Sequence, residues 1–307
     1  MKKVLVTGGS GSVGINVIKL LLSEGKYEIT VLDLNNKKTM QRLKKYRKRI
    51  NIVYGDINDK VLIDALVKDH DIVINLASVM PPLGEFSSAI GKQVDYNGTK
   101  TIINAINKYN NNCYLMYAST TSMYDQSLSG SIYEKIKIQE LSNFALNKFN
   151  TENLIQKKVK NYTIFRIPLI LNDILKEPFT FNIKRKSMIE VSTNIDVASA
   201  FVCGLNYMNK INKKIYNIGM GKNGRLIYND ILNSILKYQG LSSKYILSRL
   251  FLEKDFYSPV LTDSDKLEEL IHYRKDSLKD YYRRLKRKNK KRVIRKILAK
   301  PIILLKK

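Results

Sequence analysis

VLVTGGSGSVG, residues 4–14, is the stretch that decides the fold of this chain. It begins with a short apolar run typical of a buried strand, turns through glycines, and leads into Ile15–Leu22, whose apolar spacing predicts a helix. Gly8 permits the tight turn, Gly11 lets the backbone approach a pyrophosphate, and Gly14 lets the helix pack close to the strand. The free N–H groups of the first helical turn then face the phosphates. The stretch therefore predicts a dinucleotide site.

A lone glycine triplet also occurs in ordinary loops between a strand and a helix, so the acidic residue that follows is important. Asp33 lies in the next strand-like run, Glu28–Leu34, nineteen residues after Gly14. A carboxylate there accepts hydrogen bonds from ribose hydroxyls and repels a 2′-phosphate, which favours NAD over NADP. Lys37 and Lys38 nearby work against that preference.

Strand-like and helical patterns alternate from Met1 to about Tyr117. The strand-like runs are 3–7, 28–33, 50–55, 71–77 and 113–119. Parallel neighbours need a helical crossover, so this alternation predicts an α/β fold with a doubly wound parallel sheet of the Rossmann type. A ligand of such a sheet lies along the carboxyl ends of the strands.

Polar or small residues follow the predicted strands at those ends. Asp56 and Ile57 come after the third strand, where the carboxylate can accept a hydrogen bond from an adenine amino group; a simple turn aspartate is the alternative. Leu76 and Ala77 come after the fourth strand, where small residues allow a cofactor to approach. Thr120 belongs to a cluster of hydroxyls after the fifth strand, which is also typical of a capped turn.

Together these motifs resemble the extended short-chain dehydrogenase/reductase family, in the group of NAD-dependent epimerases and dehydratases. The resemblance covers roughly residues 1–285 and rests on the following segments: Thr7-Gly8-x-x-Gly11-x-x-Gly14, Asp33, Gly55-Asp56-Ile57, Asn75-Leu76-Ala77, Gly98-Thr99, Tyr117-Ala118-Ser119-Thr120, Tyr162–Arg166, Ile189–Ala200 with Asp196, Tyr216-Asn217-Ile218-Gly219, and Asp263–Lys266. It implies that NAD is the cofactor and that the substrate is a small molecule, for which a nucleotide sugar is the candidate in this family. The motifs are specific for the family and leave the reaction open.

The resemblance also implies a catalytic group of hydroxyl, Tyr and Lys, the last two spaced as YxxxK. The hydroxyl orients the substrate, the Tyr exchanges a proton, and the Lys lowers the pKa of the Tyr and holds the nicotinamide ribose. Thr120 occupies the hydroxyl position. Tyr133–Lys137 fits the YxxxK letters but follows Thr120 by only thirteen residues, whereas Phe144–Lys148 lies at the expected distance. We prefer Phe144 and Lys148.

With this assignment, the catalytic residues are Thr120 and Lys148, and the proton-transferring Tyr is replaced by Phe144, whose ring has no titratable oxygen. The residues expected to contact the cofactor are Gly8, Gly11, Ser12, Val13, Gly14, Asp33, Asp56, Ile57, Leu76, Ala77 and Lys148.

Other positions also depart from the family pattern. Asp95 stands where the family has Asn, and Arg166–Leu169 replaces an Arg-Pro-x-Asn stretch. No acid follows Thr120 directly, which argues against a standard 4,6-dehydratase. Replacement acids or bases could come from four residues, each of which could equally be a surface residue: Tyr124, Asp125, Glu85 and Tyr133.

The chain carries a formal net charge of +27, about half of it from the thirteen Lys and Arg residues between Tyr281 and Lys307. A basic segment with an apolar stripe predicts contact with an anionic membrane surface; a solvated helix is the equal alternative. Nucleic acid is the weaker interpretation, since no recognised binding module accompanies the charge. Two cysteines, two histidines without metal-ligand spacing and no secretory signal predict a cytoplasmic protein without a metal site.

The expected organisation is a cofactor-binding domain over 1–166, completed by about 190–219, a smaller substrate lobe from 167–189 and 220–280, and a basic helical tail over 281–307. By analogy with the family, the helices after Gln93 and Phe144 could form a homodimer. The expected function is sugar-nucleotide epimerase or reductase chemistry with NAD(P). The alternative is a non-catalytic NAD-binding scaffold or sensor, which Phe144 suggests.

Overall fold

The computed structural model describes residues 1–80, 87–124, 130–131, 136, 138, 141–171, 183–239 and 259–290. Its centre is a seven-stranded sheet in the order β3-β2-β1-β4-β5-β6-β9, in which every neighbouring pair is parallel. The strands are β1 (Lys2–Thr7), β2 (Tyr27–Asp33), β3 (Asn51–Tyr54), β4 (Ile72–Asn75), β5 (Tyr114–Thr120), β6 (Tyr162–Ile167) and β9 (Lys214–Asn217). The predicted doubly wound α/β fold is confirmed.

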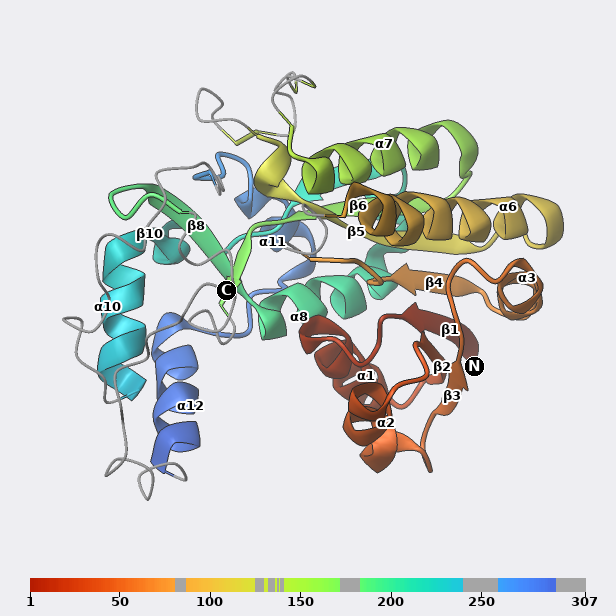
Figure 1. Cartoon of the computed structure of the whole chain (residues 1–307), viewed down its shortest axis with the longest axis horizontal. Coiled ribbons are helices and arrows are strands. Elements are labelled where there is room, and N and C mark those ends of the chain that lie inside the picture. Colours follow the sequence, from red (N-terminus) through yellow and green to blue (C-terminus); the bar gives the residue numbers. More distant parts are fainter. Residues whose placement is uncertain are drawn as a thin grey trace.

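Helices cover both faces of this sheet (Figure 1). One face packs against α1 (Ser12–Glu24), α2 (Lys37–Leu43), α8 (Asn194–Gly204) and α11 (Asp265–Ile271). The other packs against α3 (Lys60–Lys68), α6 (Thr99–Tyr109) and α7 (Asn143–Lys158). Because both faces are buried, the strands are nearly continuous apolar runs rather than alternating ones.

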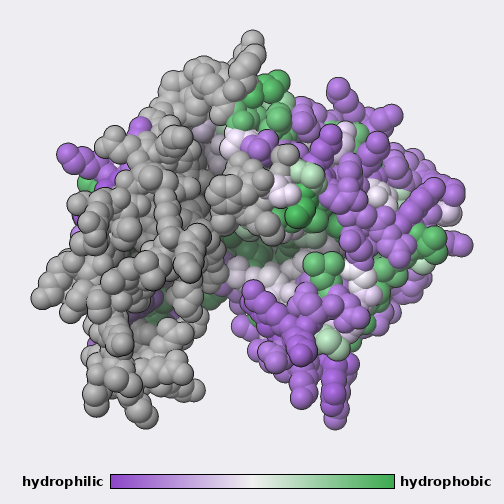
Figure 2. Space-filling view, in the orientation of Figure 1, coloured by the Kyte–Doolittle hydropathy of each residue, from purple (hydrophilic) through white to green (hydrophobic). Residues whose placement is uncertain are grey.

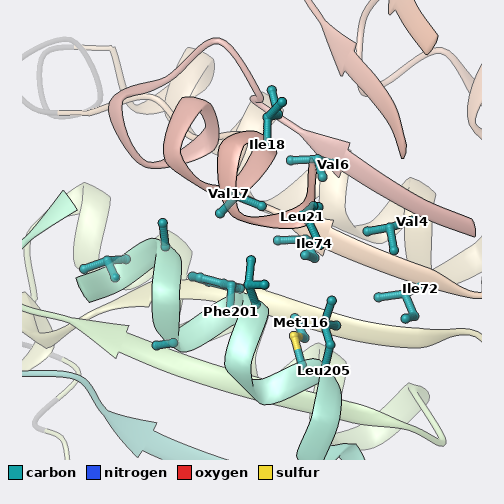
Figure 3. Packing of buried hydrophobic residues seen from close by; sticks show 14 of the residues in the cluster. Val4, Val6, Val17, Ile18, Leu21, Ile72, Ile74, Met116, Phe201 and Leu205 are labelled. Atoms are coloured by element: carbon teal, nitrogen blue, oxygen red, sulfur yellow. The ribbon is translucent and has the colours of Figure 1, made fainter. Parts of the chain in front are cut away.

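The core beside α1 and α8 shows how the first strand and helix are held together. Val17 and Leu21 of α1 lie beside Val6 of β1, and Phe201 of α8 lies beside Met116 of β5 (Figure 3). All five side chains are fully buried. Burying a side chain of this size contributes about 1.5–3 kcal/mol, so the packing anchors the turn between β1 and α1 firmly.

A second, three-stranded sheet lies toward the C-terminal half, in the order β10-β8-β7. It consists of β7 (Leu169–Leu171), β8 (Met188–Thr193) and β10 (Arg225–Ile227), and it shares an apolar cluster with α10 (Tyr228–Gln239) and α12 (Leu278–Lys290). These two helices lie side by side (Figure 1), and their Tyr238 and Tyr282 rings stack with centroids 4.8 Å apart. The first part of the predicted basic tail, 281–290, therefore belongs to a helix that packs against α10.

The helix expected over 93–109 differs from a continuous α-helix. It begins with a π-helical segment, η2 (Lys92–Gly98), and only then continues as α6. The hydroxyl of Thr99 donates to the main-chain carbonyl of Asp95 at 2.7 Å, and the hydroxyl of Thr151, which donates to the Asn147 carbonyl at 2.7 Å, lies 3.3 Å from the same Asp95 oxygen. Side-chain donors of this kind disturb the regular α-helical pattern, and π-turns often occur at functional positions.

The remaining helical segments are short. They are α5 (Ser88–Gly91), η1 (Lys44–Tyr46), η3 (Thr121–Met123), η7 (Leu205–Tyr207), α9 (Met208–Ile211) and η8 (Gly221–Gly224). Within the described ranges, none of the helices has the length and apolarity needed to cross a bilayer.

Figure 2 shows hydrophilic side chains over most of the coloured surface around α1, α2 and α3, with hydrophobic ones visible toward the middle of the molecule.

Candidate functional site

The glycine-rich turn between β1 and α1 has the close contacts that the sequence predicts. Gly8 has a φ of +67°, and a Cβ on it would lie 2.9 Å from the main-chain nitrogen of Ala77. A Cβ on Gly14 would lie 2.6 Å from the carbonyl oxygen of Gly8. The N–H of Gly11 donates to that same carbonyl at 3.0 Å and closes the turn. Any side chain at Gly8 or Gly14 would therefore force the turn apart.

The turn opens into a cavity of about 270 Å³ at the carboxyl ends of the strands. The cavity lies where the strand order changes direction, between β1 and β4, which is the usual ligand position in an open α/β sheet. Of the predicted site residues, it is lined by Gly8, Gly11, Ser12, Val13, Gly14, Leu76, Thr120, Phe144 and Lys148. One cavity thus brings together the glycine turn and the predicted catalytic position.

Asp33 lies outside that cavity, at the end of β2. Its carboxylate accepts hydrogen bonds from the N–H of Ser10 at 2.7 Å and from the N–H of Leu34 at 2.8 Å. The bond to Ser10 ties the acid to the glycine turn and fixes its orientation. The side chain is half-buried, so part of the carboxylate faces solvent at the edge of the sheet.

The other three predicted cofactor residues also lie outside the cavity lining. The Asp56 carboxylate accepts from the N–H and the side-chain amide of Asn58, at 2.8 and 2.9 Å, which is the pattern of a local turn. Ile57 is buried, and a Cβ on Gly98 would lie 2.5 Å from it. Ala77 donates its N–H to the hydroxyl of Thr7 at 3.3 Å.

Lys148 is the buried cation of the site. Its Nζ donates to the Ala118 carbonyl at 2.9 Å and lies 3.0 Å from Oδ1 of Asp95. Nζ is also 5.8 Å from the centre of the Phe144 ring and 4.9 Å from that of Tyr117. Burial alone would lower the pKa of Lys148, but the charge and hydrogen bonding of Asp95 together with the nearby Tyr117 hydroxyl outweigh burial, and the pKa lies above its ordinary value. Lys148 is therefore charged in the folded protein.

Phe144 lies beside this cation on the first turn of α7. Its side chain is only 3 % exposed, yet it forms part of the cavity wall together with Lys148. Ser142 caps the helix by accepting from the N–H of Ala145 at 3.3 Å, which fixes the first turn that carries Phe144. An apolar ring thus occupies the place where the family resemblance implies a phenol.

Thr120, the last residue of β5, also lines the cavity. Its hydroxyl lies 2.8 Å from the hydroxyl of Ser122 and accepts from the N–H of Ser122 at 3.1 Å. Thr120 therefore both caps the turn after β5 and lines the cavity. Tyr117, three residues earlier in β5, is fully buried, and burial raises the pKa of its hydroxyl to about 12.

Tyr124, a suggested replacement acid, is engaged elsewhere. Its hydroxyl donates to Asn217 at 3.0 Å and accepts from Arg166 at 2.8 Å. Arg166 in turn forms a buried ion pair with Glu152 at 2.7 Å, and Ser119 donates to the same carboxylate at 2.5 Å. Tyr124 does not line the cavity, and burial raises the pKa of its hydroxyl.

Three other suggested residues, Asp125, Glu85 and Tyr133, lie outside the described residues, as does Lys137 of the second YxxxK candidate. The cavity is also lined by Met80 and Ile170, which sequence reasoning did not name. Their position after β4 and after β6 is the signal that could have identified them. In the part of the chain that the structure describes, no group of three His, Cys, Asp or Glu side chains could hold a metal ion.

The fold and this cavity define a protein with a dinucleotide-binding fold. A family model described as the 3-beta hydroxysteroid dehydrogenase/isomerase family matches residues 5–163, slightly more than half of the chain. The chain belongs to this family, and its expected place among the extended short-chain dehydrogenases/reductases is confirmed.

Curated relatives match part of the chain at low identity. A dTDP-glucose 4,6-dehydratase of Mycolicibacterium smegmatis is 35% identical over 127 residues, which cover 40% of this chain and 37% of that protein. A CDP-paratose 2-epimerase of Salmonella typhi is 28% identical over 127 residues, covering 40% and 38%. The chain thus spans less than half the length of these two relatives.

Solved structures share the fold over almost the whole chain. The dTDP-glucose 4,6-dehydratase of Streptomyces venezuelae, solved with NAD and TYD bound, superposes with a TM-score of 0.76 at 18% identity, covering 94% of this chain and 97% of that one. The UDP-glucose 4-epimerase of Thermotoga maritima, solved with UDP-glucose, gives 0.73 at 17% identity, covering 95% and 99%. At these identities the likeness is one of fold.

Proposed function

We propose that this chain binds NAD and a nucleotide sugar in one cavity and transfers a hydride between them, as an epimerase or reductase does. The observation that carries the proposal is the glycine cradle, in which a Cβ at Gly8 or Gly14 would come within 3 Å of the backbone. Such a cradle leaves room for a pyrophosphate against the main chain. The residues present therefore fit a dinucleotide, and NAD is the cofactor of solved structures with this fold.

Each predicted residue has a role in this proposal. The N–H groups at the start of α1 bind the pyrophosphate, and Asp33, held by Ser10, binds the adenosine ribose and disfavours the 2′-phosphate of NADP. Asp56 and Ile57 lie on the adenine side. Lys148 holds the nicotinamide ribose, and Thr120 orients the substrate. When bound, NAD supplies the chemistry by accepting or returning a hydride.

The substrate class follows from the relatives of the chain. Those named above act on dTDP-glucose, CDP-paratose and UDP-glucose according to their descriptions, so a nucleotide sugar is the proposed substrate. Moving a hydride from an alcohol carbon also requires a group that accepts the hydroxyl proton. Phe144 cannot accept it, so in this proposal the proton leaves through a group other than a phenol at position 144.

A second candidate function is binding without turnover, as an NAD-dependent scaffold or sensor. Phe144 specifically favours it, because the ring lies 5.8 Å from Lys148 in the position of the missing acid. In this case the cavity binds NAD for its structural effect on the protein.

Calorimetric titration with NAD and NADH, followed by a hydride-transfer assay on a panel of nucleotide sugars, separates the two functions. We expect NAD binding in the wild type and in Phe144→Tyr. Turnover by the wild type supports the first function, whereas saturated binding without turnover across the panel supports the second. Failure of both NAD and NADH to bind would overturn the proposal.

Two further proposals concern partners. The helices α6 and α7 are proposed as a homodimer surface, which sedimentation velocity tests.

The exposed side chains Lys279, Arg283, Lys286 and Arg287 of α12 form a basic face, which we propose contacts anionic membrane surfaces. Co-sedimentation with vesicles of phosphatidylglycerol, compared with phosphatidylcholine, tests this contact, and the Lys286→Glu/Arg287→Glu variant should weaken it.

A further inference from the structure

The cavity wall contains a buried ion pair that the family resemblance does not imply. Asp95 of η2 is fully buried, and its Oδ1 lies 3.0 Å from Nζ of Lys148, which is 2 % exposed. The other carboxylate oxygen of Asp95 accepts from the N–H of Val79 at 3.4 Å. The carboxylate is thus held between the segment after β4 and the buried lysine.

In the described part of the chain, no negatively charged side chain other than that of Asp95 faces Lys148. Ala118 offers a neutral carbonyl, and Tyr117 offers a ring whose hydroxyl stays protonated because burial raises its pKa. Glu152, one turn further along α7, is paired with Arg166. The charge of Lys148 is therefore balanced by Asp95.

Two departures from the family pattern meet at this lysine. Phe144 removes a group that could become an anion beside Nζ, and Asp95 introduces an anion where the family has Asn. Burying an ammonium without a counter-charge is costly, so the two substitutions compensate each other. The Thr99 hydroxyl donates to the Asp95 carbonyl in the π-helical turn of η2, which fixes the main chain that carries the carboxylate.

We propose that Asp95 is a positioning residue that fixes and neutralises Lys148, so that this lysine no longer supports a tyrosinate beside it. Lys148 also lines the cavity, so its ammonium can meet a polar group of a bound ligand, such as a ribose hydroxyl. The site is then suited to holding a cofactor and unsuited to proton transfer at position 144. This inference rests on the proposed function, because it assumes that the cavity binds a cofactor. The ion pair itself can be tested without cofactor.

The experiment introduces a phenol next to Lys148 and titrates it with and without the Asp95 charge. Tyrosine-labelled Phe144→Tyr and Asp95→Asn/Phe144→Tyr proteins are followed by carbon NMR in the absence of NAD, and the new resonance is identified against the matching Phe144 parents. A unit charge about 5 Å away shifts a titration by roughly one to two pH units at the polarity of a protein interior. We expect the phenol to titrate at least about one pH unit lower once Asp95 is Asn.

Equal titration of the phenol in both backgrounds would overturn the proposal, as would a phenol in Phe144→Tyr that already titrates well below the ordinary value of about 10. Asp69→Asn, which removes an exposed carboxylate on the loop after α3, serves as the matched control and should leave the titration unchanged. NAD titration of the same proteins tests the proposed function separately, because the phenol titration is done without cofactor.

A second comparison keeps the proposal testable if Asp95→Asn does not fold. The Asp95→Asn/Lys148→Met variant removes both charges. Recovery of folding in this double variant supports the proposal, because it shows that the single variant failed through an uncompensated lysine. A double variant as unfolded as Asp95→Asn would contradict it.

Discussion

The two ends of the cavity differ in how they follow the family pattern. At the end formed by the glycine turn, the phosphate end, the residues from Gly8 to Gly14, with Asp33 tied to Ser10 beside the cavity, match the dinucleotide-binding pattern. At the proton-transfer end, Phe144 and Asp95 surround Lys148 with a ring and a carboxylate. The first end depends on main-chain geometry and the second on a few side chains.

The difference teaches that one cavity can keep the main-chain pattern of a phosphate site while the side chains at its other end depart from the family pattern. Main-chain N–H groups and a turn without side chains bind phosphates whatever residues line the far end of the cavity. Proton transfer needs a titratable oxygen at one position, and a single substitution removes it. The following predictions test each end separately.

The largest effect is expected at the phosphate end. Gly14→Val places side-chain atoms where even a Cβ lies 2.6 Å from the Gly8 carbonyl, so the turn must open. We expect NAD affinity measured by calorimetry to fall at least about a thousandfold, or about 4 kcal/mol. Gly25→Asn is the control, since Gly25 has a positive φ but open space around it, and Asn tolerates that conformation. NAD affinity retained in Gly14→Val would show that the turn is not the phosphate site.

The next effect concerns the stability of the proton-transfer end. Lys148→Met leaves Asp95 as a buried carboxylate without its partner, and breaking a buried pair in this way costs about 3–5 kcal/mol. Urea unfolding monitored by circular dichroism measures the loss. The control is Lys108→Met, whose ammonium is exposed on α6 and whose removal should leave the unfolding midpoint nearly unchanged. A small effect of Lys148→Met would mean that the pair contributes little to folding.

We expect the stability of the protein to depend on pH through Asp196, on the first turn of α8. Burial raises the pKa of this carboxyl to about 7, although the N–H groups of Lys275 and Asp276 donate to it. Since the unfolded group ionises near 3.8, the folded protein binds more protons between these values, and stability falls as the pH rises through this window.

We expect the free energy of unfolding of the wild type to fall between pH 5 and pH 8 by about 2 kcal/mol more than that of Asp196→Asn, measured in parallel urea titrations. The amide keeps the acceptor oxygen for both N–H groups and removes the titration. Parallel pH curves for the two proteins would contradict the raised pKa.

The smallest effect is expected in the choice of cofactor. Asp33→Asn keeps an acceptor for the Ser10 N–H and removes the charge that repels a 2′-phosphate. We expect NADP affinity to rise about tenfold relative to NAD, as one favourable charge change of about 1.4 kcal/mol would give. Asp69→Asn is the control for a general change in net charge. An unchanged ratio of the two affinities would place the ribose away from Asp33.

Much of the fold could be predicted because local patterns specify it. Apolar runs bounded by turn residues gave five strands of the large sheet within one or two residues, and the glycine spacing predicted the turn at Gly8 and Gly14. The π-helical start at η2, where the Thr99 hydroxyl donates to the Asp95 carbonyl, was missed. Helical periodicity does not register such a contact.

The sequence by itself determined the doubly wound sheet, the glycine cradle with Asp33, and the absence of a phenol at Phe144. These features depend on residue type and local spacing, which a chain carries before it folds. Only the tertiary structure decided that Asp95 meets Lys148 and that Tyr124 is held by Arg166 and Asn217. Such contacts join side chains far apart in sequence, and their geometry is set by how α7 and η2 pack against the sheet.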